Sequence, residues 1–389
     1  MATPPTLLGG LTPAEFLETY WQKKPLLIRG ALPGYQSPIS PEDLAGLACE
    51  DEVTARLIME KGGDYPWQLR YGPFTEEDFL DLPPTHWTLL VSEVNSWVPE
   101  VAALLDYFRF IPSWRIDDIM VSYAPGEGGV GAHVDNYDVF LLQAKGHRRW
   151  QINYTPVEEE HLIEDIDVRI LSDFTPDEDW VLEPGDMLYL PPRIAHNGVA
   201  MDDCMTFSVG FRAPSYEEII TGFLSYVAER IDPLARYSDP DLKPQMYAGE
   251  IGPAALERIR TVVRTLINDD EAIRSWFGSY MTEPRRGRYP EPAEESLDAE
   301  TLIHLIETGS RLKRSPLVRM AYIRHDDGDT SLFVNGAEYN ISSDLPAVAP
   351  LLTGDEPLDR TTLFPSLSQG EFAELLAELV NEGYLELSE

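Results

Sequence analysis

The sequence predicts an α+β protein in which an antiparallel β-sandwich or barrel is followed by helices and a small mixed domain. Between residues 116 and 212, short apolar and β-branched runs alternate with glycine and proline, without the helical crossovers that parallel sheets require. After Pro214, apolar residues recur at helical spacing instead. With 389 residues, the chain is long enough for two or three domains.

The N-terminal segment predicts short helices and strands that cover the sheet. Thr12 can cap a first helix over 12–21, because Pro13 suits the first helical position and Glu15 completes a capping box. The other elements expected here are a strand over 25–29, a helix over 40–49, a strand over 87–94 and a helix over 99–108.

The central block supplies most of the predicted strands. They are expected over residues 116–123, 133–143, 148–152, 180–182, 187–190, 198–201 and 206–212. The one long insertion, over 155–179, is strongly acidic and predicts a surface loop with partial helix.

The C-terminal part predicts helices over 215–230, 253–267 and 270–280, which either cover the barrel or pair with a second subunit. After a linker over 283–292 come a helix over 297–307, strands over 317–324, 331–334 and 337–341, and a helix over 369–382. This order is typical of a winged-helix unit. The domains expected are therefore 1–213, 214–290 and 291–389.

Charge limits the classes of partner. The chain has 67 Asp and Glu against 30 Lys and Arg, a formal net charge of -37, which repels nucleic acid and attracts basic proteins. Adaptation to a salty cytoplasm is the alternative reading. The winged-helix part has six basic residues against 17 acidic ones between Asp298 and Glu389. We therefore expect it to contact another protein or to have a structural role, without direct DNA binding.

Cysteine content and hydropathy indicate the cellular compartment in which the protein works. Two cysteines without a CxxC spacing do not form a disulfide framework. The sequence shows neither a signal peptide nor an apolar run of about 18 residues. We therefore expect a cytoplasmic protein with no membrane partner.

His133 and Asp135 are the first candidates for a chemical site. On a strand, alternate side chains share a face, so His133, Asp135 and Tyr137 would project together. Of the other histidines, His196 follows a later strand of the same block and lies outside the acidic insertion and the basic run. Two His and one carboxylate are the ligand set of non-heme Fe(II) oxygenases. The glycines over 126–131 are expected to let a substrate backbone approach the metal.

Arg148 is the candidate anchor for a co-substrate. An oxygenase of this kind needs a cation for the distal carboxylate of 2-oxoglutarate, and arginine can grip a carboxylate with two hydrogen bonds. Arg148 lies on the strand expected after the one that carries the metal pair, with Arg149 on its other face. The alternative is that this basic run forms a solvated edge.

Three long motifs identify a family. The segments FLETYWQKKPLLIRG, SWRIDDIMVSYAPGEGGVGAHVDNYDVFLLQAKGHRRW and EPGDMLYLPPRIAHNGVA resemble the JmjC-type ribosomal oxygenases, in particular the bacterial ribosomal-protein arginine hydroxylases. The resemblance covers essentially the whole chain. It implies a double-stranded β-helix of the jelly-roll or cupin class, a helical dimerisation region over 214–290 and a C-terminal winged-helix domain.

The resemblance also implies an activity. It is the 3-hydroxylation of an arginine in large-subunit ribosomal protein number sixteen, with Fe(II), 2-oxoglutarate and O2 as requirements and succinate and CO2 as co-products. On the matching positions, His133, Asp135 and His196 would be catalytic metal ligands, and Arg148 would anchor 2-oxoglutarate.

One position departs from the family pattern. A serine that helps to bind the co-substrate in some relatives is Ala124 in this chain. Either the hydroxyl is dispensable or another donor replaces it, for which the candidates are Tyr123, Asn136 and Asn197.

A pocket for the substrate arginine can be placed on neighbouring strands, because a guanidinium needs a carboxylate and benefits from an aromatic or soft apolar wall. We expect Asp118 to pair with the guanidinium, Met120 and Tyr137 to flank its stem, and Ser208 to add a hydrogen bond. Asp117, on the alternate face of its strand, is the competing choice.

Two kinds of alternative remain. Within the enzyme class they are histidine hydroxylation and lysine demethylation, the second of which an aromatic cage would favour over a lone carboxylate. Outside it, the alternative is a non-catalytic cupin-like scaffold that holds a basic protein against its acidic surface.

Overall fold

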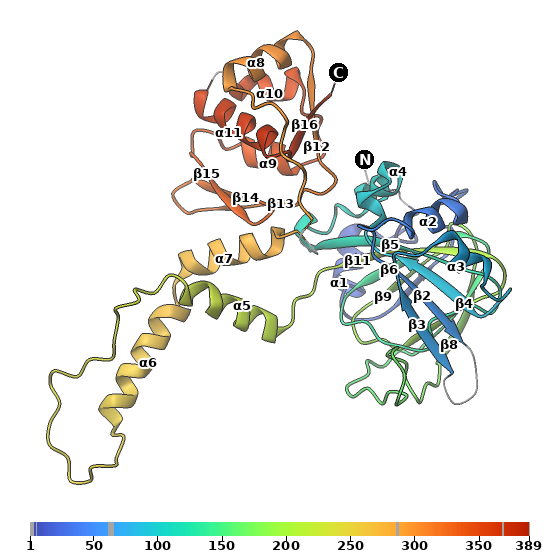
Figure 1. Cartoon of the computed structure of the whole chain (residues 1–389), viewed down its shortest axis with the longest axis horizontal. Coiled ribbons are helices and arrows are strands. Elements are labelled where there is room, and N and C mark those ends of the chain that lie inside the picture. Colours follow the sequence, from blue (N-terminus) through green and yellow to red (C-terminus); the bar gives the residue numbers. More distant parts are fainter. Residues whose placement is uncertain (1–3, 5, 61–65, 285–287, 368, 389) are drawn as a thin grey trace. The chain divides into compact units, whose positions relative to one another are not determined.

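The computed structural model describes residues 4, 6–60, 66–284, 288–367 and 369–388 (Figure 1). The chain divides into two compact units, Met1–Ala213 and Pro214–Glu389, each of which is described by itself. Residues 285–287 of the predicted linker lie outside the described residues. Within the described part of the chain, no helix is both long enough and apolar enough to cross a membrane.

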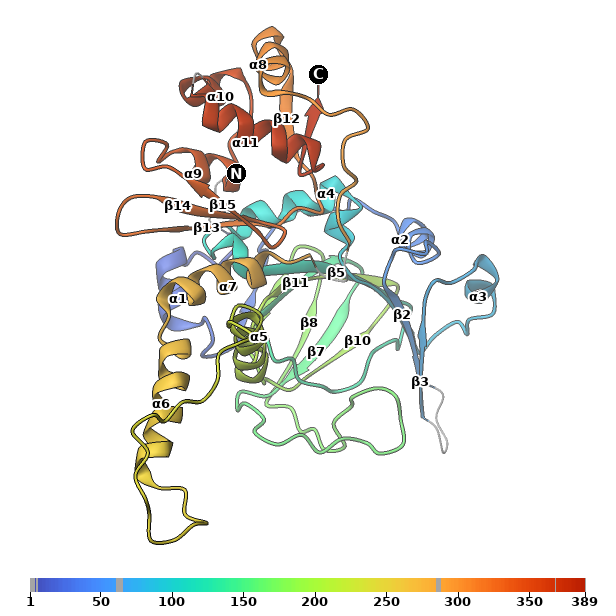
Figure 2. The same ribbon diagram turned by 60° about the vertical axis from the view of Figure 1, so that its left-hand side comes forward.

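The first unit is a jelly roll of two antiparallel sheets (Figure 2). The larger has eight strands in the order β1 (Leu26–Ile28), β9 (Met187–Leu190), β6 (Val139–Lys145), β11 (Cys204–Phe211), β5 (Ile116–Ala124), β4 (Trp87–Val91), β2 (Ala55–Glu60) and β3 (Trp67–Tyr71). The smaller has three, in the order β10 (His196–Ala200), β7 (Arg148–Ile152) and β8 (Glu178–Leu182). The predicted antiparallel β fold is confirmed.

Alternate side chains of the larger sheet enter two different apolar layers, because successive residues of a strand face opposite ways. Phe207 of β11 lies in the outer layer, where Phe16 of the N-terminal segment also packs. Leu141 of β6 lies in the inner layer, between the sheets, with Trp150 of β7. This alternation along each strand decides which polar side chains reach the interior of the jelly roll.

Short helices cover the outer layer. They are α1 (Pro13–Thr19), α2 (Pro41–Leu47), α3 (Glu76–Leu80) and α4 (Pro99–Ala102), with 3-10 turns η1 (Val94–Ser96), η2 (Ala103–Phe108) and η3 (Ser113–Arg115). The expected capping box is present: the Glu15 N–H donates to Thr12 Oγ1, and the Glu15 carboxylate accepts from the Thr12 N–H. Phe16 then meets the rings of Phe140 and Tyr189 at 5.5 and 4.9 Å.

The strand predicted over 133–143 is wrong in its first half, because β6 begins only at Val139. Asp138 is the last residue before β6. Its buried carboxylate accepts hydrogen bonds from Tyr189 Oη (2.6 Å) and Gln22 Nε2 (2.9 Å). His133 instead forms one isolated antiparallel bridge with His196.

Two other parts of the first unit differ from expectation. β2, β3 and α3 were not expected from the sequence. In β2, Arg56 interrupts the apolar run ARLIME and hides its strand pattern. The insertion, predicted to be partly helical, is described in full and contains no helix between β7 and β8. Its residues bond to their neighbours through turns and one isolated bridge, Leu162 to Leu171.

The second unit begins with three helices, α5 (Tyr216–Ala228), α6 (Pro253–Ile267) and α7 (Asp270–Thr282). Phe223 and Val227 of α5 pack against Trp276 of α7. No residue of α6 is buried. Its apolar stripe, Leu256, Ile259, Val262 and Val263, is 46–57% exposed.

The rest of the second unit is a winged-helix fold. Its elements are α8 (Ala299–Thr308), β12 (Arg311–Arg314), β13 (Met320–Arg324), β14 (Thr330–Val334), β15 (Ala337–Ile341), α9 (Val348–Thr353), α10 (Arg360–Leu367), α11 (Gly370–Asn381) and β16 (Leu385–Ser388). The β12–β16 pair and helices α9 and α10 were not predicted. Phe333 of β14 is fully buried and lies so close to Gly278 of α7 that a Cβ there would be 2.3 Å from its ring.

Candidate metal centre

Two segments far apart in the sequence, one with His133 and Asp135 and the other with His196, meet where β10 begins. The backbones of His133 and His196 exchange two N–H···O bonds of 3.0 Å, which places their side chains next to each other. The Arg193 N–H donates to the Asp135 carbonyl at 2.7 Å, so the loop before His196 also holds the residues after His133.

The side chains of His133, Asp135 and His196 converge. One ligand atom from each lies within 4.8 Å of the others, and His196 Nε2 is 3.6 Å from Asp135 Oδ2. His133 Nδ1 lies 3.0 Å from the Gly131 carbonyl and His196 Nδ1 lies 2.9 Å from the Ile194 carbonyl. These carbonyls can only accept, so each Nδ1 carries the proton and each Nε2 has a free lone pair.

The chemistry of this donor set fits a first-row divalent metal. Two imidazoles whose Nδ1 atoms face backbone carbonyls, together with one carboxylate on one side, form a facial set that leaves other coordination positions open. Burial, together with the neighbouring His133, lowers the pKa of His196 from 6.5 to about 4. His196 is therefore neutral, as a metal ligand must be, at neutral pH.

The lowered pKa of His196 predicts acid sensitivity of the metal-free protein. The unfolded chain takes up a proton near pH 6.5, but the folded chain does so only near pH 4. Stability is therefore complete above about pH 6.5 and is lost as the pH falls to about 4, by on the order of 3 kcal/mol. Chemical unfolding of wild type and His196→Leu in chelator should show a wild-type loss that the variant lacks. Equal pH dependence of the two would contradict this prediction.

Arg148 is buried on the interior face of β7, 4% exposed. Its Nε donates to Cys204 Sγ at 3.4 Å, whereas its Nη2 has no hydrogen-bond partner among the described residues. The indole N–H of Trp150, on the same face, is also buried without a partner in the described part of the chain. Unpaired buried donors are costly, and together they form a site that fits an anionic group with several acceptor oxygens.

The three donors proposed to replace a serine at Ala124 do not reach this interior. Ala124 packs inside with Ala200 and Cys204. Tyr123 must face the other way and packs in the outer layer. Asn197 faces away from the interior and donates to Gln151 Oε1 at 3.4 Å, and Asn136 is exposed and accepts from Arg193 Nη1 at 3.1 Å. None of these three side chains is a hydrogen-bond partner of Arg148 in the described part of the chain.

A β-bulge aims the candidate substrate carboxylates at the same place. The pairing of β11 with β5 shifts between Val209 and Phe211, so that Asp117 and Asp118 both lie opposite Gly210. A Cβ on Gly210 would be 3.7 Å from Asp118 Oδ1 and 3.9 Å from the Cβ of Asp117. The expectation that Asp117 occupies the alternate face is therefore wrong, because a bulge breaks the alternation of a strand.

Asp118 is the better positioned of the two carboxylates. The Glu93 N–H donates to its Oδ2 at 2.8 Å. A Cβ on Gly210 would lie 3.7 Å from its Oδ1 and 3.8 Å from the Tyr137 ring. Burial of the Tyr137 hydroxyl, and the charges of Asp135 and Asp118, raise the pKa of Tyr137, although 40% of the residue is exposed. The Tyr137 phenol therefore stays neutral next to the carboxylates of Asp135 and Asp118.

Met120 and Ser208 are direct partners across β5 and β11 and share one face. Ser208 is 8% exposed. Arg56 of β2 places Nη2 3.7 Å from Met120 Sδ and was not selected from the sequence, because its strand was missed. Met120 and Ser208 thus share one face of the larger sheet, and Asp118 and Tyr137 both lie beside Gly210 of the same sheet.

Two family models match the chain. One, for the JmjC domain, matches residues 103–219, and the other, for a ROXA-like winged helix, matches residues 265–386. The ribosomal protein uL16 3-hydroxylase of Escherichia coli K12 is 37% identical over 95% of this chain and 96% of its own length. The chain belongs to the JmjC-type ribosomal oxygenases. A probable ribosomal oxygenase of Haemophilus influenzae is 40% identical over 66% of this chain and 64% of its own.

Solved structures of a ribosomal oxygenase also resemble this chain. The E. coli ribosomal oxygenase YcfD in complex with cobalt and 2-oxoglutarate has a TM-score of 0.85 and 36% identity, over 97% of this chain and 99% of that one. A second structure of YcfD contains cobalt and succinic acid, with the same TM-score. The resemblance inferred from the sequence motifs is confirmed, and the jelly roll and the winged helix belong to this family.

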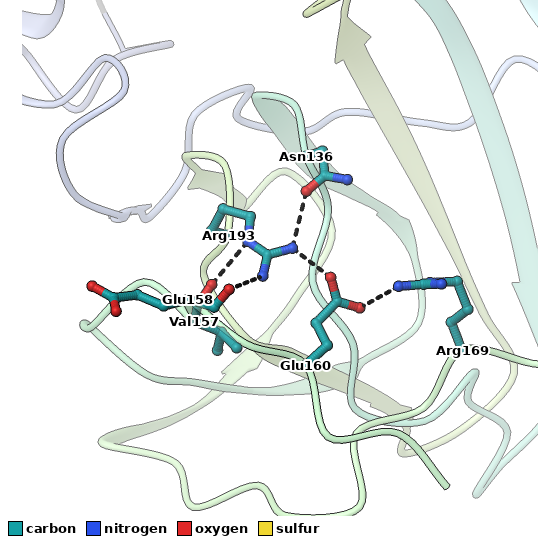
Figure 3. Close-up of polar contacts among 6 residues, drawn as sticks. All are labelled: Asn136, Val157, Glu158, Glu160, Arg169 and Arg193. Carbon is teal, nitrogen blue, oxygen red and sulfur yellow. Dashed lines mark hydrogen bonds and ion pairs between the residues drawn. The ribbon is translucent and has the colours of Figure 1, made fainter. Parts of the chain in front are cut away.

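Arg193 is a further residue near the metal centre that was not expected from the sequence. Its guanidinium binds Asn136, Glu160 and two backbone carbonyls of the acidic insertion (Figure 3). A charged residue three positions before His196 was the available signal.

Proposed function

We propose that this ribosomal oxygenase uses Fe(II), 2-oxoglutarate and O2 to hydroxylate C3 of an arginine side chain in ribosomal protein uL16, number sixteen of the large subunit. The observation that carries the proposal is the convergence of His133, Asp135 and His196 within 4.8 Å, on an interior that also holds the unpaired donor of Arg148. The identity to the E. coli uL16 3-hydroxylase over 96% of that protein supports the substrate.

Each side chain of the site has a separate task in this proposal. Fe(II) held by His133, Asp135 and His196 would supply the oxidation of an unactivated C–H bond by O2, while 2-oxoglutarate becomes succinate and CO2. Arg148 binds the distal carboxylate of 2-oxoglutarate and orients it. The Trp150 ring centroid lies 5.8 Å from Arg148 Cζ and 5.9 Å from the His196 ring centroid. Trp150 excludes water from the space next to these two side chains.

The substrate arginine is held by charge and packing. Asp118 Oδ1 accepts from its guanidinium, while Met120 and Tyr137 flank the stem and Ser208 supplies a further hydrogen bond. Gly210 has no side chain, which leaves the space between Asp118 and Tyr137 open. A carboxylate at this point favours arginine over methyl-lysine, which an aromatic cage would bind.

Mass spectrometry tests the proposal directly. Purified protein with Fe(II), ascorbate and 2-oxoglutarate should add 16 Da to one arginine of uL16 and release succinate. Hydroxylated histidine or demethylated lysine in ribosomal proteins would instead support those activities. Neither product from a full panel of ribosomal proteins would overturn the enzymatic proposal and favour a scaffold that binds a basic protein.

Asp118→Asn should lower kcat/KM for a uL16 peptide by about 30-fold or more, because removing one partner of a desolvated charge pair costs about 2–5 kcal/mol. The amide can still accept the Glu93 N–H, so the fold should persist. Asp117→Asn is the matched control and should change kcat/KM far less. Equal peptide kinetics for wild type and Asp118→Asn would remove Asp118 from the pocket.

The surroundings of the reaction follow from the same proposal. The net charge of -37 would speed the approach of a basic ribosomal protein and make it salt-dependent. We place the reaction in the cytoplasm, where bacterial ribosomes are assembled.

We also propose that the chain forms a homodimer through its 214–290 region, which includes the exposed apolar stripe of α6, since stripes of this kind are normally covered. The winged-helix region, 291–389, does not bind DNA directly in this proposal.

A further inference from the structure

The acidic insertion between β7 and β8 contacts the segment that leads into His133. Ile170 and Leu171 are 3% and 7% exposed, so this end of the insertion is buried rather than a surface loop. The Leu171 N–H donates to the Ala132 carbonyl at 2.8 Å. A Cβ on Gly131 would be 2.6 Å from Ile170, and Gly131 has a φ of +80°. The absence of a side chain at Gly131 therefore accommodates the insertion.

The same insertion holds the segment that leads into His196. The Asn153 N–H donates to the Ala195 carbonyl at 3.1 Å, and the Ala195 N–H donates to Asn153 Oδ1, also at 3.1 Å. Both backbone groups of the residue before His196 are thus bonded to Asn153, the first residue after β7 and just ahead of the insertion. The two imidazole-bearing segments are fixed from opposite ends of one loop.

Arg193 joins the residues around Asp135 to this arrangement (Figure 3). Its Nε donates to the Val157 carbonyl at 2.9 Å, its Nη1 to Asn136 Oδ1 at 3.1 Å and to the Glu160 carboxylate, and its Nη2 to the Glu158 carbonyl at 3.3 Å. Asn136 directly follows Asp135. One guanidinium therefore bridges the insertion and the carboxylate segment of the metal centre.

The backbone of Arg193 makes a second bridge between the same segments. Its N–H donates to the Asp135 carbonyl at 2.7 Å, and its carbonyl accepts from the Val157 N–H at 2.8 Å. Its φ of 69° is unfavourable for a residue with a side chain. Such a conformation is strained and persists where the surroundings over-determine it, as these six hydrogen bonds do.

Glu160 remains charged to receive Arg193. Burial opposes its ionisation, but hydrogen bonds from Arg193 and Arg169 outweigh burial and hold the pKa of Glu160 below its ordinary value. Arg169 binds the other carboxylate oxygen at 2.8 Å, and its side chain is 73% exposed. Arg169 thus touches the same carboxylate without reaching the metal-ligand segments.

We propose that Arg193 is a positioning residue of the metal centre, which fixes Asp135 relative to His196 by tying both of their segments to the acidic insertion. The proposal rests on the proposed function only in that a divalent metal binds the three ligands. It assigns the insertion a task in shaping the metal site, in addition to any contact with substrate.

Titration of the chelator-treated full chain with Co(II) alone, followed by its visible absorption, tests this inference. Arg193→Ala should weaken Co(II) binding by about 10- to 100-fold, the usual effect of losing a partner that orients metal ligands. Arg193→Lys, which keeps the charge but not the fork, should fall between wild type and Arg193→Ala. Arg169→Ala is the matched control and should bind Co(II) as wild type does.

The outcomes separate this inference from the proposed function. If wild type binds Co(II) and both Arg193 variants bind it equally well with the same spectrum, Arg193 is not a positioning residue, even if the variants melt at lower temperature. If wild type binds no Co(II), the metal-dependent function fails and the inference fails with it. Should Arg193→Ala not fold, unchanged binding by Arg193→Lys and Glu160→Gln overturns the inference.

Discussion

His133→Ala should reduce uL16 hydroxylation and Co(II) affinity by more than about 100-fold, beyond the 10- to 100-fold typical for a residue that only orients a ligand. His133 supplies one of three protein ligands, and its neighbours offer no replacement: His196 and Asp135 already belong to the same set. The measurements are the +16 Da product by mass spectrometry and the visible spectrum of added Co(II).

His147→Ala is the matched control for His133→Ala. His147 is exposed, in the turn between β6 and β7, and its Nδ1 lies 2.7 Å from Asp202 Oδ2. Because His147 is not among the converging ligands, its removal should leave Co(II) affinity and hydroxylation unchanged. Wild-type Co(II) affinity in His133→Ala would contradict the ligand assignment.

The metal ligands could be selected from sequence because the signal is chemical: two His and one Asp in a β-rich block form a small, recognisable set. Their arrangement could not be predicted in the same way. Alternation along an assumed strand placed His133 and Asp135 together, yet the structure achieves this with a single bridge and a loop held by Arg193. Such contacts join residues about 60 positions apart, and periodicity reports only on neighbours.

The errors around the co-substrate and substrate sites have two physical causes. Tyr123 directly precedes Ala124 on β5, so strand alternation turns its side chain to the opposite face, where it packs in the outer layer. For Asp117, alternation was applied correctly but the β-bulge opposite Gly210 interrupted it. A bulge depends on the pairing of two strands, which one strand's sequence does not reveal.

Arg148→Met should weaken 2-oxoglutarate binding by about 30- to 5,000-fold, which corresponds to the loss of about 2–5 kcal/mol when one partner of a buried charge pair is removed. Methionine fills similar apolar space on β7 but offers no donor to a carboxylate. Isothermal titration with 2-oxoglutarate in the presence of Co(II) measures the effect. Arg149→Met is the matched control, because Arg149 is on the outer face of β7 and pairs with Asp179.

The same variant should have the opposite effect on the protein without co-substrate. A buried guanidinium with an unpaired Nη2 is destabilising, and replacing a buried charge by a hydrophobic residue of similar volume is often neutral or stabilising by about 1–4 kcal/mol. The melting temperature of Arg148→Met without 2-oxoglutarate should therefore equal or exceed that of wild type, and added 2-oxoglutarate should raise only the wild-type value. A variant that melts lower yet still binds 2-oxoglutarate would show that Arg148 serves the fold instead. The combination of gained stability and lost binding distinguishes a residue kept for its ligand from one kept for packing.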